Sequence, residues 1–148
     1  MLRTLRRSVA WLMGEEPIWL LREWVDEAHS RALRTHGGLS GIRDAHAIEA
    51  AIDSPRNLWA YGDESDLFVL SAHLLVAVAK CHGYNDGMKR TALSAAVMFL
   101  GANGIVVHLD DAKAELYTQR AVRCTEAERG KVEMSIAFWL ELASREND

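Results

Sequence analysis

Residues 82–100 read HGYNDGMKRTALSAAVMFL. The stretch joins a polar turn, residues 82–90, to an apolar segment, residues 91–100. Apolar residues recur nearly all round a helix in the second part, which predicts a buried central helix. Gly101 and the Asn103-Gly104 pair are expected to end this helix, because both favour the left-handed backbone of helix C-termini.

The polar turn is the candidate functional site. The helix N-terminus beside it offers unpaired backbone N–H groups and the positive end of the helix dipole, where phosphate oxygens bind well. Lys89 and Arg90 are cations in the first turn, a position that opposes the dipole and indicates an anionic ligand. His82 is a titratable base, Asp86 a ligand for hard metal ions, and Gly87 lets the backbone approach a ligand closely.

Simpler interpretations of the same residues stay open at this point. An isolated His82 is more often a packed core histidine than a base. Asp86-Gly87 is a common turn pair, and Lys89 with Arg90 can form a solvated first turn. Cys81 beside His82 favours an inert thiol over a nucleophile, because neighbours on a helix end point about 100° apart.

The rest of the chain reads as helices joined by short turns. Residues 67–79 follow helical spacing after Ser65 or Asp66 as N-cap, and Tyr84 is expected to place its ring in the core. Before residue 67 we expect a helix opened by Pro17 and stopped at Gly37-Gly38, then a short helix capped by Asp44 and ended by Asp53-Ser54-Pro55. A loop or small hairpin is expected over residues 55–64. After the central helix we expect an edge strand over residues 105–108, a helix capped by Asp110 or Asp111, and a last helix begun by the Thr125–Glu128 capping box.

Together these features predict an all-α fold, a helical bundle around residues 91–100 with one small hairpin or edge strand at most. The chain has 148 residues, 49% of them hydrophobic, enough for one compact domain. Its net charge of −4 argues against a general nucleic-acid binder. Two cysteines without a secretory signal fit a reducing cytoplasm, and no apolar run reaches membrane-spanning length.

Residues 1–12 differ from the rest, with three arginines and no acidic residue. They are interpreted as a basic extension that precedes a single domain over residues 13–148. A short amphipathic helix, a weak targeting segment and an upstream start before Met13 are the alternatives for this extension.

The polar turn resembles the signature of the Fic/Doc family, which runs His, any residue, Phe, any residue, Asp or Glu, Gly or Ala, Asn, Gly or Lys, Arg. The matching positions are His82, Tyr84 (for Phe), Asp86, Gly87, Lys89 and Arg90. Residues 89–91 look most like the Doc, or death-on-curing, branch, in which Lys replaces a glycine. Residues 36–44, 50–55 and 66–68 also fit that pattern, so the resemblance covers residues 17–142. Met88 stands where the family has Asn.

The resemblance implies ATP and Mg²⁺ as cofactors and gives each residue of the turn a role. His82 would be the general base that takes a proton from a target hydroxyl, and Asp86 would hold Mg²⁺. Lys89 and Arg90 would neutralise charge on the transferred group, and Tyr84 would anchor the motif. The phosphate-binding positions implied in this way are Asn85, Gly87, Met88, Lys89 and Arg90.

For function, the resemblance implies the toxin of a toxin–antitoxin pair that modifies a hydroxyl of a translation factor such as elongation factor Tu, held in check by a Phd-type antitoxin. The Lys at position 89 favours transfer of the terminal phosphoryl group over transfer of AMP. A member impaired by Met88, which keeps the fold and antitoxin binding, is an alternative, because a thioether cannot replace the amide contact to phosphate. The third interpretation is an unrelated helical binding module.

Overall fold

The computed structural model describes residues 15–145. The basic segment predicted over residues 1–12 lies outside this range. Within it the chain forms six α-helices and no β-strand. They are α2 (Arg22–His36), α3 (Ala45–Tyr61), α4 (Leu67–Lys80), α5 (Met88–Ala102), α6 (Asp111–Arg123) and α7 (Glu126–Arg145). The all-α prediction is confirmed.

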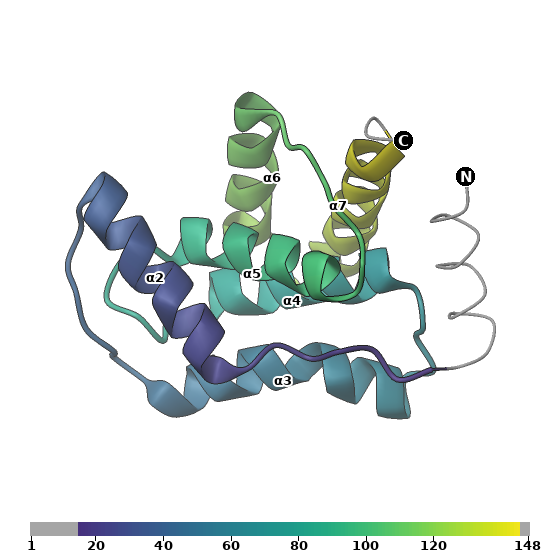
Figure 1. The fold of residues 1–148 in the computed structure, drawn as a ribbon, viewed down its shortest axis with the longest axis horizontal. Helices are drawn as coiled ribbons and strands as arrows, with labels where there is room; N and C mark the ends of the chain where they lie inside the picture. Colours follow the sequence, from purple (N-terminus) through teal and green to yellow (C-terminus); the bar gives the residue numbers. More distant parts are fainter. Residues whose placement is uncertain (1–14, 146–148) are drawn as a thin grey trace.

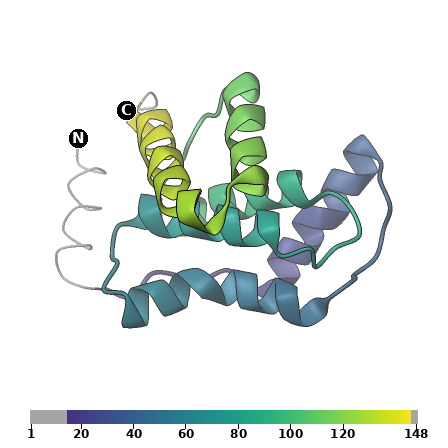
Figure 2. The ribbon, with the colours of Figure 1, turned by 180° about the vertical axis from the view of Figure 1, so that it is seen from behind.

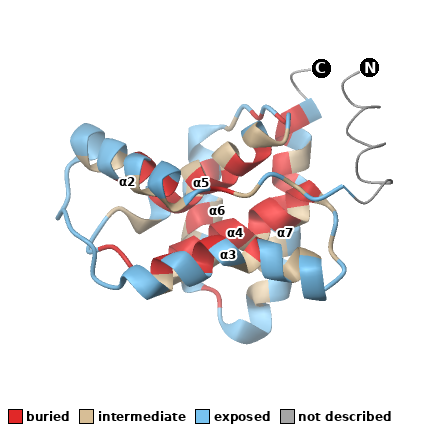
Figure 3. Cartoon of the chain, turned by 60° about the horizontal axis from the view of Figure 1, so that its bottom comes forward, coloured by how far each residue is buried: buried red, intermediate tan, exposed pale blue. Residues whose placement is uncertain are grey.

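The centre of the bundle is a pair of helices, α4 and α5, which pack along each other. Helix α4 also contacts α3, α6 and α7, and α5 also contacts α2 and α6. In Figure 1, α6 and α7 stand above this pair, α3 lies below it and α2 crosses one end; Figure 2 gives the same arrangement from behind. Figure 3 shows buried residues concentrated along α4 and α5, with exposed residues on the outer faces of the surrounding helices.

Helix α5 is the predicted buried central helix, but its burial is one-sided although its apolar residues recur nearly all round it. Its buried residues are Thr91, Ala92, Ala95, Ala96, Phe99 and Leu100. The small alanines let α4 approach closely, while Phe99 and Leu100 fill the core at the far end. The half-buried residues of the other side, Leu93, Ser94, Val97 and Met98, line a cavity. This asymmetry leaves one face of a core helix open to a ligand or partner.

The predicted helix starts are confirmed wherever a side chain caps the first turn. The carboxylates of Asp44, Asp66 and Asp110 each accept a hydrogen bond from a backbone N–H group two or three residues ahead. At the start of α7, Glu128 accepts from the Thr125 N–H and Thr125 Oγ1 accepts from the Glu128 N–H, which completes the capping box.

Helix α3 continues through Pro55 to Tyr61, so both the predicted stop at residues 53–55 and the loop over residues 55–64 are wrong. A proline removes the N–H that would bond the carbonyl four residues earlier, here that of Ala51. The Ser54 hydroxyl donates to this carbonyl instead, over 2.7 Å. The Ser54 hydroxyl thus replaces the missing N–H donor to the Ala51 carbonyl and lets the helix continue.

Two further boundaries differ from prediction. The helix expected from Pro17 begins only at Arg22, because the Asn103 side chain holds the backbone of Ile18 in extended form. Asn103 Oδ1 accepts a hydrogen bond from the Ile18 N–H, and Asn103 Nδ2 donates one to the Ile18 carbonyl oxygen. Residues 105–108 form no strand. Ile105 and Val107 are buried in alternation along this extended segment, but residues 15–145 contain no neighbouring strand for it to pair with. No helix in the described range has the length and apolar character needed to cross a membrane.

Candidate active site

The polar turn forms the loop between α4 and α5. Helix α4 ends at Lys80, and Cys81 follows as its C-cap. His82 is exposed and adopts φ 51°, in the left-handed region that non-glycine residues seldom occupy. Such a conformation turns the chain sharply after α4, and it costs free energy that the surrounding loop contacts must offset. The imidazole is thereby presented at the surface.

Tyr84 fixes the middle of the loop in the core. Its side chain is buried, its OH donates to Asp26 Oδ1 of α2 over 2.5 Å, and its ring stacks on His29 with 3.8 Å between centroids. Burial and the neighbouring Asp26 carboxylate raise the pKa of the Tyr84 phenol far above its usual range. The phenol therefore stays protonated and serves as a tether, not as a base.

A strap formed by residues 37–44 lies against the loop. The Asn85 backbone N–H donates to Gly41 O over 3.1 Å, and Asn85 Nδ2 donates to Ser40 O over 3.1 Å. The N–H groups of residues 43 and 44 both donate to Gly83 O. Asn85 is one of the predicted phosphate-binding positions, and in the structure its side-chain amide nitrogen holds the strap.

Asp86 is exposed, and two backbone groups orient its carboxylate. Oδ1 accepts from the Gly87 N–H over 2.9 Å, and Oδ2 accepts from the Leu39 N–H over 3.2 Å. The hydrogen bond from Gly87, and to a lesser extent that from Leu39, lowers the pKa of Asp86 below its usual 3.8. The carboxyl group is therefore an anion at neutral pH. A Cβ at Gly38, which has φ 125°, would lie 2.9 Å from Asp86 Oδ2, so the strap approaches closely only because residue 38 is glycine.

Helix α5 begins directly after this carboxylate. Gly87 is its N-cap, with φ 79°. Met88 is the first helical residue and packs against the core. Lys89 and Arg90 follow on the surface, and Lys89 Nζ lies 3.4 Å from Glu115 Oε1 of α6. An exposed ion pair of this kind contributes little to stability, so an anionic ligand can replace Glu115 as the partner of Lys89.

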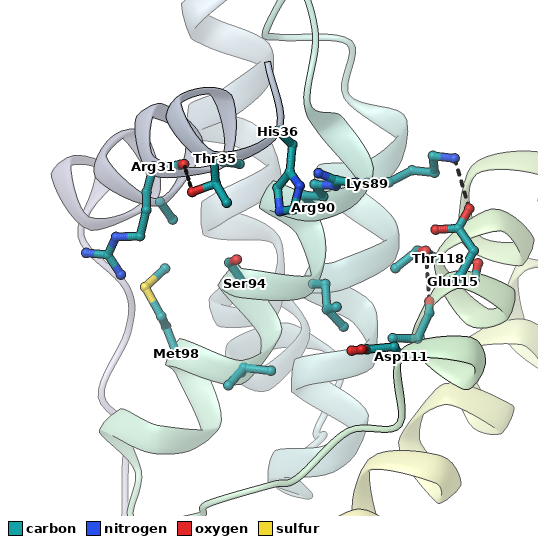
Figure 4. Close-up of a pocket in the computed structure, with 15 residues that line it drawn as sticks. Arg31, Thr35, His36, Lys89, Arg90, Ser94, Met98, Asp111, Glu115 and Thr118 are labelled. Atoms are coloured by element: carbon teal, nitrogen blue, oxygen red, sulfur yellow. Dashed lines mark hydrogen bonds and ion pairs between the residues drawn. The ribbon is translucent and has the colours of Figure 1, made fainter. Parts of the chain in front are cut away.

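A cavity of about 780 Å³ lies on the open face of α5, between α2 and α6 (Figure 4). Lys89 and Arg90 lie at the end of the cavity near the α5 N-terminus, with His36 beside Arg90 and Glu115 across from Lys89. His82 and Asp86 are not among its lining residues. The structure therefore gathers the two cations at the cavity, and leaves the imidazole and the carboxylate on the preceding loop.

A family model described as the Fic/DOC family matches residues 19–100, more than half of the chain. The chain belongs to the Fic/DOC family. This Fic/DOC chain is 43% identical over 79 residues to "Protein kinase doc" of Escherichia phage P1. The aligned region covers 53% of the chain and 63% of the phage protein. It is 35% identical over 92 residues to "Toxin Doc" of Mycolicibacterium smegmatis, which is 59% of the chain and 70% of that protein. The match thus spans less than two thirds of the phage protein.

Sequence reasoning missed three residues that shape the loop of this Fic/DOC chain. His29 and Asp26 come from α2, and Leu39 comes from the strap. A signal for His29 exists in the sequence, because it lies four residues after Val25 on the buried face of α2. No sequence signal indicates that the Leu39 N–H binds Asp86, since a backbone donor carries no residue identity.

Proposed function

We propose that this chain is a nucleotide-dependent transferase that moves the terminal phosphoryl group of ATP to a hydroxyl of a translation factor, of the elongation factor Tu kind. The observation that carries the proposal is the start of α5. An N-terminus opened by a left-handed glycine places backbone N–H groups, Lys89 and Arg90 together beside an ionised Asp86. The relatives named a protein kinase and a toxin support the same activity.

Asp86 has the properties of a Mg²⁺ ligand. Magnesium is held in kinase sites by one or two carboxylates together with water and substrate phosphates, and not by a cage of protein ligands. Among the described residues no group of three or more His, Cys, Asp and Glu side chains could hold a metal. A single oriented, exposed carboxylate fits this mode, and the ion when bound would supply positive charge to the phosphates.

His82 is the residue proposed to move the proton. Its imidazole accepts the proton of the target hydroxyl, the hydroxyl oxygen forms a bond to the γ-phosphorus, and the bond to the β-phosphate oxygen breaks to release ADP. Lys89 and Arg90 stabilise the charge that develops on the phosphoryl oxygens. The exposure of His82 suits a protein substrate, whose side chain must reach the base from solvent.

An impaired member of the family is the second candidate, and Met88 is the observation that favours it. The side chain packs against the core and carries no hydrogen-bond donor for a phosphate oxygen. This candidate keeps the fold and antitoxin binding but has lost efficient transfer. A comparison of transfer rates between wild type and Met88→Asn separates the two.

The proposed transfer is tested with ATP labelled at either the γ or the α position, Mg²⁺ and elongation factor Tu. We expect label on the factor from the γ position only, and its loss with His82→Ala. His108→Ala is the matched control, because His108 is an exposed histidine in the segment before α6. Label from the α position alone would show AMP transfer and overturn the kinase assignment.

The partner proposed for the open face of α5 is the tail of a Phd-type antitoxin, bound as a helix. Apolar side chains of α2 and α5, namely Ala28, Ala32, Leu93, Val97 and Met98, line the cavity, with charged side chains at its rim. Such a groove fits the apolar face of an amphipathic helix. The name of the mycobacterial relative, a toxin, supports a neutralising partner.

A further inference from the structure

We propose that His29 is a positioning residue that locks the peptide group between Asp86 and Gly87 in one orientation. Through this peptide it sets the direction of the Asp86 carboxylate and of the first N–H groups of α5. The proposal rests on the proposed function for the identity of the ligand, Mg²⁺ with a nucleotide. The locking itself follows from contacts within the chain.

The Asp86–Gly87 peptide is held at both of its polar ends. His29 Nε2 lies 2.8 Å from Asp86 O, and because a carbonyl oxygen can only accept, Nε2 must carry the proton. At the other end, the Gly87 N–H donates to Asp86 Oδ1 over 2.9 Å. The first contact fixes the carbonyl, and the second then points the N–H at the carboxylate.

A lock is needed because the residue after this peptide is glycine. Gly87 has φ 79°, and glycine adopts positive and negative φ with nearly equal ease, so a flip of the preceding peptide meets little steric resistance. A flipped peptide would turn the Asp86 carbonyl toward its own carboxylate and remove one of the two donors that orient it. Asp86 is exposed, and apart from the strap at Gly38 and Leu39 little surrounds its side chain to oppose that change.

His29 is rigid enough to act as the lock. It is 5% exposed, and its ring lies nearly parallel to that of Tyr84, at 14° between planes. Tyr84 is in turn tied to Asp26, which lies three residues before His29 on α2. One turn of α2 therefore holds both the anchor of the loop and the donor to Asp86 O.

The alternative is that His29 has only a packing role in the core. Two substitutions distinguish this packing role from the proposed positioning role. His29→Phe keeps a ring that can stack on Tyr84 but has no donor for Asp86 O. His29→Gln loses the ring but keeps an N–H donor. If His29 only packs, Phe is the better replacement; if it locks the peptide, Gln is.

Binding of ADP with Mg²⁺ is measured by calorimetry, and thermal unfolding of each variant checks the fold. We expect affinity to fall about tenfold or more in His29→Phe and to stay within about threefold of wild type in His29→Gln, the scale found for residues that orient metal ligands. The Gly87 amide resonance in ¹⁵N NMR is expected to move in Phe and to stay near its wild-type position in Gln. A Phe variant with wild-type affinity and Gly87 resonance would overturn the proposal.

The wild-type protein supplies a test that needs no variant. The ¹⁵N shifts of the His29 ring report which nitrogen carries the proton, and we expect Nε2–H in the folded protein. The Nδ1–H tautomer would contradict the lock. If wild type fails to bind ADP with Mg²⁺, the proposed function fails, while the ring tautomer and the Gly87 resonance still decide the role of His29.

Discussion

Met88 stands at the position where the resemblance to the Fic/Doc signature leads us to expect Asn. A hydrogen bond from an amide to a charged phosphate oxygen contributes about 1.5–3 kcal/mol, which a thioether cannot supply. We expect Met88→Asn to raise the rate of phosphoryl transfer about 10- to 100-fold by that difference. The same substitution should lower the free energy of unfolding by about 1 kcal/mol, because Met88 packs against the core. Initial rates with γ-labelled ATP and chemical denaturation measure the two effects.

Met88→Leu is the matched control for this substitution. Leucine conserves the volume and apolar character of methionine, so both stability and transfer should stay close to wild type. If Asn and Leu behave alike in transfer, residue 88 does not limit the reaction, and the impaired-member alternative loses its basis.

At the scale of single helices, the Ser54–Pro55 pair decides whether α3 continues. Ser54→Ala removes the donor to the Ala51 carbonyl, which Pro55 cannot replace. We expect the free energy of unfolding to fall by about 1 kcal/mol, the usual net value of one such bond, with partial fraying of residues 55–61. Denaturant titration followed by circular dichroism measures it. Ser135→Ala, on an exposed position of α7, should leave stability within about 0.5 kcal/mol.

A second element-scale prediction concerns the tie between α4 and α7. Glu133 Oε1 accepts from His73 Nδ1 over 2.9 Å and from Arg129 Nε over 3.0 Å. Burial raises the pKa of Glu133, but these two hydrogen bonds outweigh it and hold the pKa below the ordinary 4.5. Because the folded pKa is the lower one, the stabilisation is present above pH 4.5 and is lost as pH falls through the folded pKa.

Glu133→Gln should therefore cost about 1–3 kcal/mol of unfolding free energy at pH 7, and the difference from wild type should shrink below pH 4. Glu126→Gln is the control, since Glu126 is 82% exposed and lies 3.7 Å from the same Arg129. An exposed pair contributes under about 1 kcal/mol, so this variant should show no comparable pH dependence. Equal losses from both variants would contradict the role given to Glu133.

Helix starts could be predicted from the sequence because a capping side chain and its N–H partner are two or three residues apart. Local sequence is therefore enough to predict the caps formed by Asp44, Asp110 and the Thr125–Glu128 pair, and the structure confirms them. Pro17 and Pro55 were misread for opposite reasons. The helix expected at Pro17 is delayed by Asn103, distant in the chain, and the break expected at Pro55 is prevented by the neighbouring Ser54.

At the scale of the whole molecule, the candidate site combines a contiguous motif with groups that only folding brings to it. His82, Asp86, Lys89 and Arg90 can be proposed from the sequence because they lie within nine residues of each other. His29, the Leu39 N–H and Glu115 approach from α2, the strap and α6, and their partners are 57, 47 and 26 residues away. The cavity beside α5 has the same origin, because it forms where α2 and α6 leave one face of a core helix uncovered.

That uncovered face leads to a prediction about the proposed antitoxin partner. Ser94 points into the cavity between α2 and α6 (Figure 4), and a bulky neutral side chain there occupies the space that an antitoxin helix needs. We expect Ser94→Tyr to weaken binding of a Phd-type antitoxin at least tenfold in calorimetry, because an overfilled groove cannot accept the apolar face of the helix. Ser135→Tyr makes the same change on an exposed position of α7 and should bind as wild type does. Wild-type affinity in Ser94→Tyr would contradict the proposed docking in this cavity and would place the proposed antitoxin on another surface.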